Sequence, residues 1–131
     1  MSAPQPNDKK LKELIVFIAL HSEGDKWFGS TKLNKLLFFS DFLAYQYLGR
    51  PITGHEYQKL DHGPAPRYLM PLREAMEIDG DIAVRSENLY GHRQHRILAL
   101  RQPDLSEFTA EEVELVRDLI EEFWNKSAKH V

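Results

Sequence analysis

The chain has 131 residues, of which 42% are apolar, enough for one domain with one hydrophobic core. It has no cysteine, which excludes a disulfide framework and a thiolate nucleophile and fits a reducing cytoplasm. The net charge is −3, so the basic excess typical of nucleic-acid-binding proteins is absent. The longest apolar run, Leu14–Leu20, is far shorter than the roughly 20 residues of a membrane span. We therefore expect a cytoplasmic protein that does not enter the membrane.

The beginning of the chain predicts a disordered segment followed by a helix. Residues 1–7 are polar and include two prolines, so we expect no ordered structure there. Asp8 can cap a helix that runs to about His21. The apolar residues of this helix recur at i, i+3, i+4 and i+7, which places them on one face. They are Leu11, Leu14, Ile15 and Ile18.

A second helix is predicted to begin at a cap on Ser30 or Thr31 and to end at Gly49, before Pro51. From Leu36 to Leu48 it is apolar on nearly all sides. A helix of this kind is typical of the centre of a core. We therefore expect this second helix to be the central element of the fold.

The charged and aromatic residues of the second helix have different expected places. Lys32 and Lys35 lie in its first turns and are expected to face solvent. Most of its aromatic residues are expected in the core, and one or two exposed aromatic side chains would mark an interface. These aromatic residues are Phe38, Phe39, Phe42, Tyr45 and Tyr47.

A short strand is predicted at Tyr57–Leu60, followed by a proline-rich turn. The turn contains Gly63, which permits a sharp bend, and two prolines at Pro64 and Pro66. Because proline has no N–H to donate, these residues predict a rigid turn without regular ladder pairing.

A third helix is predicted from Pro71 to Asp79, since proline is tolerated in a first turn and Gly80 closes the pattern. Two strands are then predicted at Asp81–Glu87 and Arg93–Leu100, because apolar and polar residues alternate in both. The residues 88–92 between them are expected to form the loop of a hairpin.

The last predicted helix runs from Thr109 to about Asn125 and has the most complete start signal. Thr109 and Glu112 fit a capping box, and Phe108 and Val113 occupy the flanking positions that pack together as a hydrophobic staple. Its expected buried stripe consists of Val113, Val116, Ile120 and Phe123.

Together these elements predict an α+β fold: a mainly helical single domain, residues 8–126, with a short strand and a β-hairpin. The order of helices and hairpin is similar to that of a winged helix. Residues 127–131 are expected to form a tail.

The residues that carry chemistry form no recognisable catalytic or metal-binding pattern. Six histidines are present, but His92 and His95 on a strand would point to opposite faces, and no His-Glu-x-x-His sequence occurs. No serine lies in a Gly-x-Ser-x-Gly elbow, and no glycine-rich phosphate loop is present. We therefore expect no enzyme activity, no metal and no cofactor.

The predicted hairpin leaves open an alternative function in nucleic-acid binding. Arg85, Arg93 and Arg96 give it a local positive charge, and the wing of a winged helix lies against phosphates. The third helix, which would have to read the bases, carries acidic as well as basic residues. A DNA-binding regulator is therefore an alternative, and a solvated hairpin is the favoured interpretation.

Three motifs in succession are informative as a set. They are Lys-Leu-Asn-Lys-Leu-Leu at 32–37, Gly-Arg-Pro-Ile-Thr-Gly at 49–54 and Gly-Pro-Ala-Pro at 63–66. In this order and spacing the chain resembles the Panacea domain of SocA-like antitoxins and phage-associated proteins. It differs from that pattern at His62, where an aromatic residue is common, and it stops at Val131, so we expect a C-terminus that is truncated relative to the family.

The resemblance implies an antitoxin that neutralises a cognate protein toxin by direct contact, either by masking it or by also delivering it to a protease. Such a protein needs a binding surface and no reaction centre. The residues that we expect to reach the partner lie around the rigid turn or close to it. They are Lys35, Tyr57, Lys59 and His62.

Overall fold

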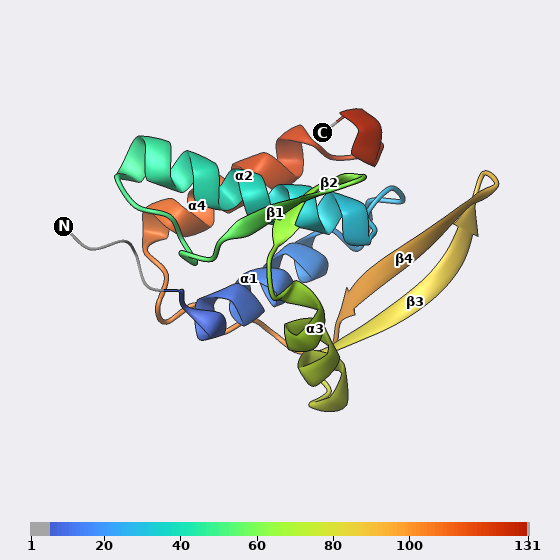
Figure 1. Ribbon diagram of the computed structural model, residues 1–131, viewed down its shortest axis with the longest axis horizontal. Helices are drawn as coiled ribbons and strands as arrows, with labels where there is room; N and C mark the ends of the chain where they lie inside the picture. The colour runs from blue at the N-terminus through green and yellow to red at the C-terminus, as the bar shows by residue number, and fades with distance from the viewer. Residues whose placement is uncertain (1–5, 131) are drawn as a thin grey trace.

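The computed structural model describes residues 6–130 and confirms a single small α+β domain (Figure 1). Four α-helices, two pairs of strands and a final 3-10 helix follow one another along the chain. The elements are α1 (Asp8–His21), α2 (Ser30–Leu48), β1 (Tyr57–Leu60), β2 (Gly63–Pro66), α3 (Leu69–Ile78), β3 (Ile82–Leu89), β4 (His92–Ala99), α4 (Ala110–Glu122) and η1 (Ala128–His130). Strands β1 and β2 form one antiparallel sheet, and β3 and β4 form a second.

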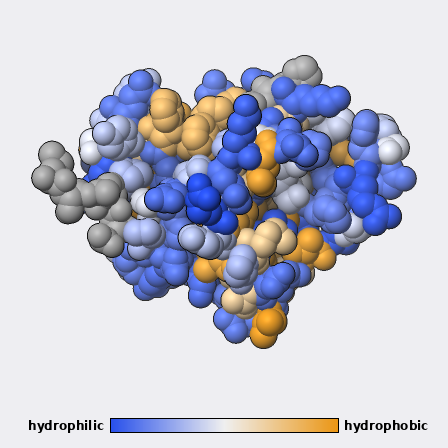
Figure 2. All heavy atoms as spheres, in the orientation of Figure 1, coloured by the Kyte–Doolittle hydropathy of each residue, from blue (hydrophilic) through white to orange (hydrophobic). Residues whose placement is uncertain are grey.

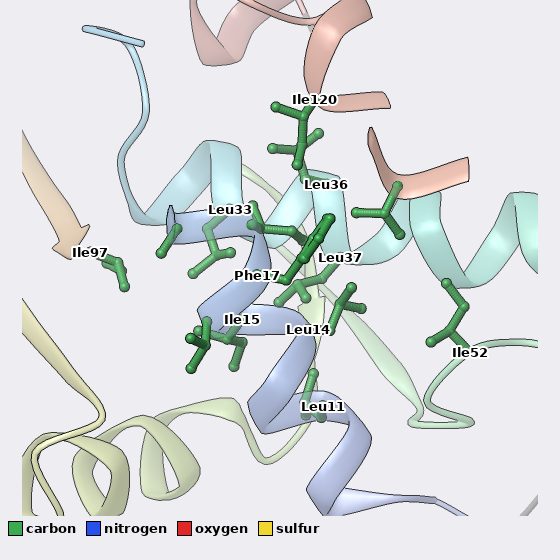
Figure 3. Packing of buried hydrophobic residues seen from close by; sticks show 14 of the residues in the cluster. Leu11, Leu14, Ile15, Phe17, Leu33, Leu36, Leu37, Ile52, Ile97 and Ile120 are labelled. Atoms are coloured by element: carbon green, nitrogen blue, oxygen red, sulfur yellow. The ribbon is translucent and has the colours of Figure 1, made fainter. Parts of the chain in front are cut away.

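The centre of the core is α1, where the sequence predicted α2. Residues from Leu14 to Ala19 are all buried, so this helix is enclosed on every side along more than a turn. Figure 3 shows its side chains meeting those of α2, with Ile97 of β4 and Ile120 of α4 at the edges of the cluster. Helix α1 contains the longest uninterrupted apolar run of the sequence, Leu14–Leu20, which is consistent with this central position.

Helix α2 buries its first half and leaves much of its second half exposed. Leu36 and Leu37 are fully buried, as predicted. Phe42 is 49% exposed, Tyr45 62% and Tyr47 73%, because the outer face of the last turns is not covered by another described element. The expectation of a central α2 is therefore wrong for these turns. The expectation that most of its aromatic side chains lie in the core is also wrong, because three of the five are exposed where one or two were expected.

The Gly-Arg-Pro-Ile-Thr-Gly motif folds back onto α2 through one buried carboxylate. Asp41 accepts hydrogen bonds from the backbone N–H of Thr53 at 2.6 Å and from its hydroxyl at 2.5 Å. Ile52, between the two glycines of the motif, is buried in the core. The motif is thus a turn that pins the end of α2 to the start of β1.

The prolines of the Gly-Pro-Ala-Pro motif do take part in a regular ladder, which corrects the sequence prediction. Tyr57 lies opposite Pro66, and Lys59 lies opposite Pro64. The N–H of Arg67 donates to the carbonyl of Glu56, so Glu56 and Arg67 form a hydrogen-bonded pair. In an antiparallel ladder such pairs alternate with pairs that exchange no hydrogen bond, and the pairs that contain Pro66 and Pro64 are of this second kind. Both prolines occupy such positions, where a missing N–H costs nothing.

The β3–β4 hairpin is longer than predicted and has a tighter turn. Leu89 pairs with His92, so only Tyr90 and Gly91 form the turn, at φ of 50° and 82°. Two positive φ values in a row suit the right-handed twist of the strands. The side-chain oxygen of Asn88 accepts from the N–H of Gly91 at 3.0 Å and stabilises the turn. The loop predicted at residues 88–92 is therefore replaced by a two-residue turn.

The helix starts agree with the predictions to within two residues. Helix α3 begins at Leu69, two residues before the predicted start, with Pro71 in its first turn. The capping box of Thr109 and Glu112 is confirmed, with both reciprocal hydrogen bonds present. Of the expected α4 stripe, Val116 and Ile120 are buried and the outer two residues are half-buried.

The N-terminal cap of α1 is Asn7 and not Asp8. The Asn7 side chain accepts from the N–H of Lys10 at 2.9 Å, and its backbone N–H donates to the carbonyl of Thr53 at 2.8 Å. Asn7 therefore belongs to the ordered fold, contrary to the prediction, and residues 1–5 lie outside the described residues. Among the described helices, none combines the length and the apolar character needed to cross a bilayer.

Candidate partner-binding cleft

A cleft of about 800 Å³ lies where four distant segments of the chain come together. Its walls are the first turn of α2, the tip of the β1–β2 hairpin, one end of β4 and the segment from Ser127 to Lys129. The side chains that give the cleft its chemical character are Trp27, Lys35, His62, Arg93, His95 and Lys129.

Lys32 forms the base of the cleft and is buried, which corrects the prediction that it faces solvent. Its side chain is 1% exposed. The amine donates to Asp25 Oδ2 at 2.5 Å and to the carbonyls of Phe123 and Lys126 at 2.5 and 2.8 Å. Burial lowers the pKa of the Lys32 amine, against the opposing effect of the Asp25 carboxylate. Lys32 therefore ties α2 to the end of α4, where the helix dipole favours a cation.

Lys35 is also part of the framework, where the sequence predicted a solvated rim residue. It is half-buried, and its amine donates to the carbonyl of Ala128. The stem of the side chain runs over Gly63, where an added Cβ would lie 2.9 Å from Lys35 Cε. Gly63 also has φ +129°, so both its conformation and its neighbour require glycine. The two motif lysines thus hold the C-terminal segment against α2.

The other predicted partner residues fall in different places. His62 is exposed and lines the cleft, next to Lys35. Lys59 is exposed and is not among the residues that line the cleft. Pro64 is half-buried and Pro66 is buried in the β1–β2 ladder, so the motif turn supports the cleft and offers little surface of its own.

Tyr57 lies away from the cleft, and its hydroxyl is used inside the protein. The hydroxyl oxygen is 2.6 Å from Asp41 Oδ2 and 2.9 Å from the carbonyl oxygen of Leu37. Burial, followed by the charge of Asp41, raises the pKa of Tyr57 well above its usual value. The Tyr57 hydroxyl is therefore occupied inside the protein, and its ring lines a second groove, where the predicted partner contact would involve the ring.

This second groove, which we call the aromatic groove, has a volume of about 310 Å³ and lies along the second half of α2. Its walls include Phe38, Phe42, Tyr45, Pro51 and Tyr57. In Figure 2, hydrophobic atoms are visible at the upper surface of the molecule, over α2. The rings of Phe38 and Phe42 stack with centroids 5.9 Å apart.

The three arginines of the hairpin do not form a common phosphate-binding face. Arg96 is 6% exposed, and its guanidinium donates to Glu87 at 3.1 Å and to the carbonyl of Asp25 at 2.6 Å. Arg85 is exposed and lies 3.5 Å from the Glu87 carboxylate. Only Arg93 lines the cleft. The prediction of Arg96 as a nucleic-acid contact is wrong, because this side chain joins the hairpin to the α1–α2 loop.

Several cleft residues carry no signal in the sequence. Trp27, His95 and Lys129 come from a loop, a strand and the last helix, and only the folded topology brings them together. The histidines do not gather into a metal site. Within residues 6–130, no three histidine, aspartate or glutamate side chains are placed to hold an ion.

A family model described as "Antitoxin SocA-like, Panacea domain" matches residues 33–131 of the chain. The match spans α2 from Leu33 onwards, both strand pairs, α3 and α4. The cleft residues that it leaves out are those of the loop before α2 and of the first turn of α2, up to Lys32. Comparisons with curated proteins and with solved structures gave no match.

Proposed function

Because the chain belongs to the SocA-like antitoxin family with a Panacea domain, we propose that it is the antitoxin of a toxin–antitoxin pair and neutralises its toxin by direct protein binding. The single observation that carries this proposal is the family match over residues 33–131, three quarters of the chain. We further propose that the chain acts stoichiometrically and not as an enzyme.

The way in which the family motifs are used supports a binding role. Lys32 and Lys35 of the first motif direct their amines into the protein, where they fasten the C-terminal segment, and Thr53 of the second motif is bound by Asp41 of α2. The motifs thus build a rigid frame, and the frame surrounds a cleft whose exposed residues lie outside the motifs. A preorganised surface loses less conformational entropy on binding, which favours a tight complex.

We propose that the same frame lets one fold serve different toxins. Exposed residues such as His62, Arg93 and Lys129 can be exchanged without breaking the internal hydrogen bonds described above. Specificity then comes from the lining of the cleft and of the aromatic groove, while Lys32 and Lys35, with the Asp25 carboxylate and the backbone carbonyls that accept from them, keep the geometry. Surface substitutions of this kind have small effects on folding.

Growth rescue combined with co-purification tests the proposal. The toxin is sought in the open reading frame beside the gene and is expressed with and without the chain. We expect growth only when both are expressed, and we expect a tagged chain to retain the toxin at a fixed molar ratio. Rescue by trace amounts of the chain, with no complex recovered, would instead indicate enzymatic reversal of the toxin's effect.

Separate variants assign the toxin-binding face. Lys59→Glu and His62→Ala alter exposed side chains and should leave the melting temperature unchanged. If His62→Ala weakens toxin retention and Lys59→Glu does not, the cleft is the contact site. If neither variant loses toxin, the aromatic groove becomes the better candidate, and Tyr45→Ala is the variant to compare, because its side chain is exposed there.

A further inference from the structure

The cleft runs along the outer edge of β4 next to the hairpin turn, where Leu89 of β3 also lines it. Four consecutive residues of the strand, 92–95, line the cleft. Successive side chains of a strand point to opposite faces, so a cleft that borders four in a row runs along the strand edge. Within residues 6–130, the sheet contains only β3 and β4. The outer edge of β4 therefore carries N–H and C=O groups that the ladder does not use.

The opposite wall of the cleft is held in place by Lys32 and Lys35. Ser30 and Thr31 of α2 and the segment from Ser127 to Lys129 face the strand edge across the cleft. Lys32 and Lys35 hold this segment through the carbonyls of Lys126 and Ala128. On the other side, Gln94 and Arg96 of β4 donate to the carbonyls of Lys26 and Asp25 in the loop that leads into α2. Both walls are thus fastened, the cleft keeps its width, and its volume of about 800 Å³ suits a peptide-sized ligand.

The charges around the cleft favour an acidic occupant. Arg93 and Lys129 are exposed cleft residues for which no ion pair is present among the described residues. Asp61 is the one carboxylate among the described lining residues. The chain as a whole has a net charge of −3, so this local positive charge runs against its average.

We propose that the cleft binds an extended, acidic segment of the toxin, which adds to the outer edge of β4 as a third strand, with Arg93 and Lys129 pairing with its carboxylates. This inference rests on the proposed antitoxin function and gives it a contact mode. Main-chain hydrogen bonds supply affinity in strand addition, and side chains at alternate positions supply specificity. The same edge can therefore serve toxins that share little sequence.

A single-stranded nucleic acid fits the cleft less well than a peptide does. Such ligands are bound by aromatic side chains on which bases stack. In the cleft, Trp27 already packs against Tyr90, with ring centroids 5.8 Å apart, and the Lys26 amine lies over both rings. The Trp27 ring is therefore less open to a stacking base. A free strand edge offers N–H and C=O groups in the spacing of another polypeptide backbone.

The test uses the purified full chain and a fluorescein-labelled peptide of about eight residues, a common strand length, in which Glu alternates with Val. Fluorescence anisotropy should show saturable binding. The same peptide with Gln in place of Glu should bind about tenfold more weakly, as expected for the loss of a few partly exposed ion pairs. A third peptide, N-methylated at every residue, has no N–H to donate to the strand edge and should not bind.

Matched double variants separate a local contact from a general charge effect. Arg93→Gln with Lys129→Gln should weaken binding of the acidic peptide about tenfold. Arg50→Gln with Arg67→Gln removes the same charge from exposed positions outside the cleft lining and should leave binding unchanged. On addition of the acidic peptide, amide hydrogen exchange should slow at residues 92–95. Equal weakening by both double variants, or full binding of the N-methylated peptide, would overturn the proposal.

The remaining outcomes are equally decisive. No binding of the acidic peptide, with toxin rescue and co-purification intact, would overturn the strand-addition site and leave the antitoxin function standing. Absence of any toxin complex would remove the proposed function itself. Tighter binding of a single-stranded oligonucleotide than of the acidic peptide, lost in the Arg93→Gln, Lys129→Gln variant, would assign the cleft to nucleic acid.

Discussion

Replacement of Lys32 by Met should destabilise the protein strongly, because this amine satisfies a buried carboxylate and two buried carbonyls at once. The side chains of Lys32 and Asp25 are 1% and 3% exposed. Lys32→Met leaves the Asp25 carboxylate buried without its cation. Breaking a buried ion pair in this way costs about 3–5 kcal/mol, much of the stability of a domain of this size.

A double variant shows whether the cost comes from the stranded charge. In Asp25→Asn the side-chain oxygen can still accept from the N–H of Trp27, as Asp25 Oδ1 does at 3.0 Å. The combination Lys32→Met with Asp25→Asn should therefore be more stable than Lys32→Met alone, because no buried charge is left unpaired. Urea unfolding of the four proteins measures the coupling, and hydrogen exchange should locate the loosening at residues 123–130. A Lys32→Met protein whose free energy of unfolding lies within about 1 kcal/mol of the wild-type value would refute a stabilising role for these Lys32 contacts.

Three further predictions follow from the same contacts. Leu37→Ala should cost about 2–5 kcal/mol in urea unfolding, because Leu37 is fully buried in the core, and a value below about 1 kcal/mol would contradict that burial. Burial raises the pKa of the Glu13 carboxyl, but the hydrogen bonds from Arg101, the hydrogen bond from the N–H of Asp104 and the charge of Arg101 together outweigh it, so the folded-state pKa lies below its usual value. The stabilisation is thus present above the unfolded-state pKa and is lost as the pH falls through the folded-state pKa. Glu13→Gln should therefore destabilise at neutral pH, and its difference from the wild type should shrink in acid; a pH-independent difference would refute this. Duplex DNA should bind weakly and without sequence preference at moderate salt, and tight promoter binding lost in Arg93→Ala would restore the DNA-binding alternative.

The local signals of the sequence were reliable because they depend on few residues. The capping box of Thr109 and Glu112 needs only its own helix turn, and the stop at Gly49 needs only the backbone. Both follow from hydrogen-bonding groups that no distant segment can replace. For the same reason the order of elements and the α+β class could be predicted.

The wrong prediction that Lys32 and Lys35 face solvent shows that the sequence alone does not reveal hydrogen-bond partners from distant segments. A lysine in the first turn of a helix usually faces solvent, and that expectation failed for Lys32 because its acceptors lie 91 and 94 residues away along the chain. The prediction that Pro64 and Pro66 prevent regular strand pairing was also wrong, because their pairing depends on which positions of the ladder bear hydrogen bonds. The first error concerns partners far away in the chain, and the second concerns the register of a short hairpin.

The cleft was predicted only in part. His62 and Arg93 were both singled out by type, one as a toxin contact and one as a phosphate contact, and the structure places both in one cleft. Trp27 and Lys129 had no motif, and their positions follow from the packing of the α1–α2 loop and of η1 around α2. A site made from four segments becomes visible only when the topology is known.

Titration of the purified chain into the purified toxin, followed by calorimetry, tests the central claim most directly. We expect heat that saturates at a fixed molar ratio and a complex of the same ratio by native mass spectrometry, since a stoichiometric inhibitor must occupy the toxin it silences. If co-expression restores growth while the two purified proteins give neither heat nor a complex, neutralisation does not proceed by direct binding, and the claim is contradicted.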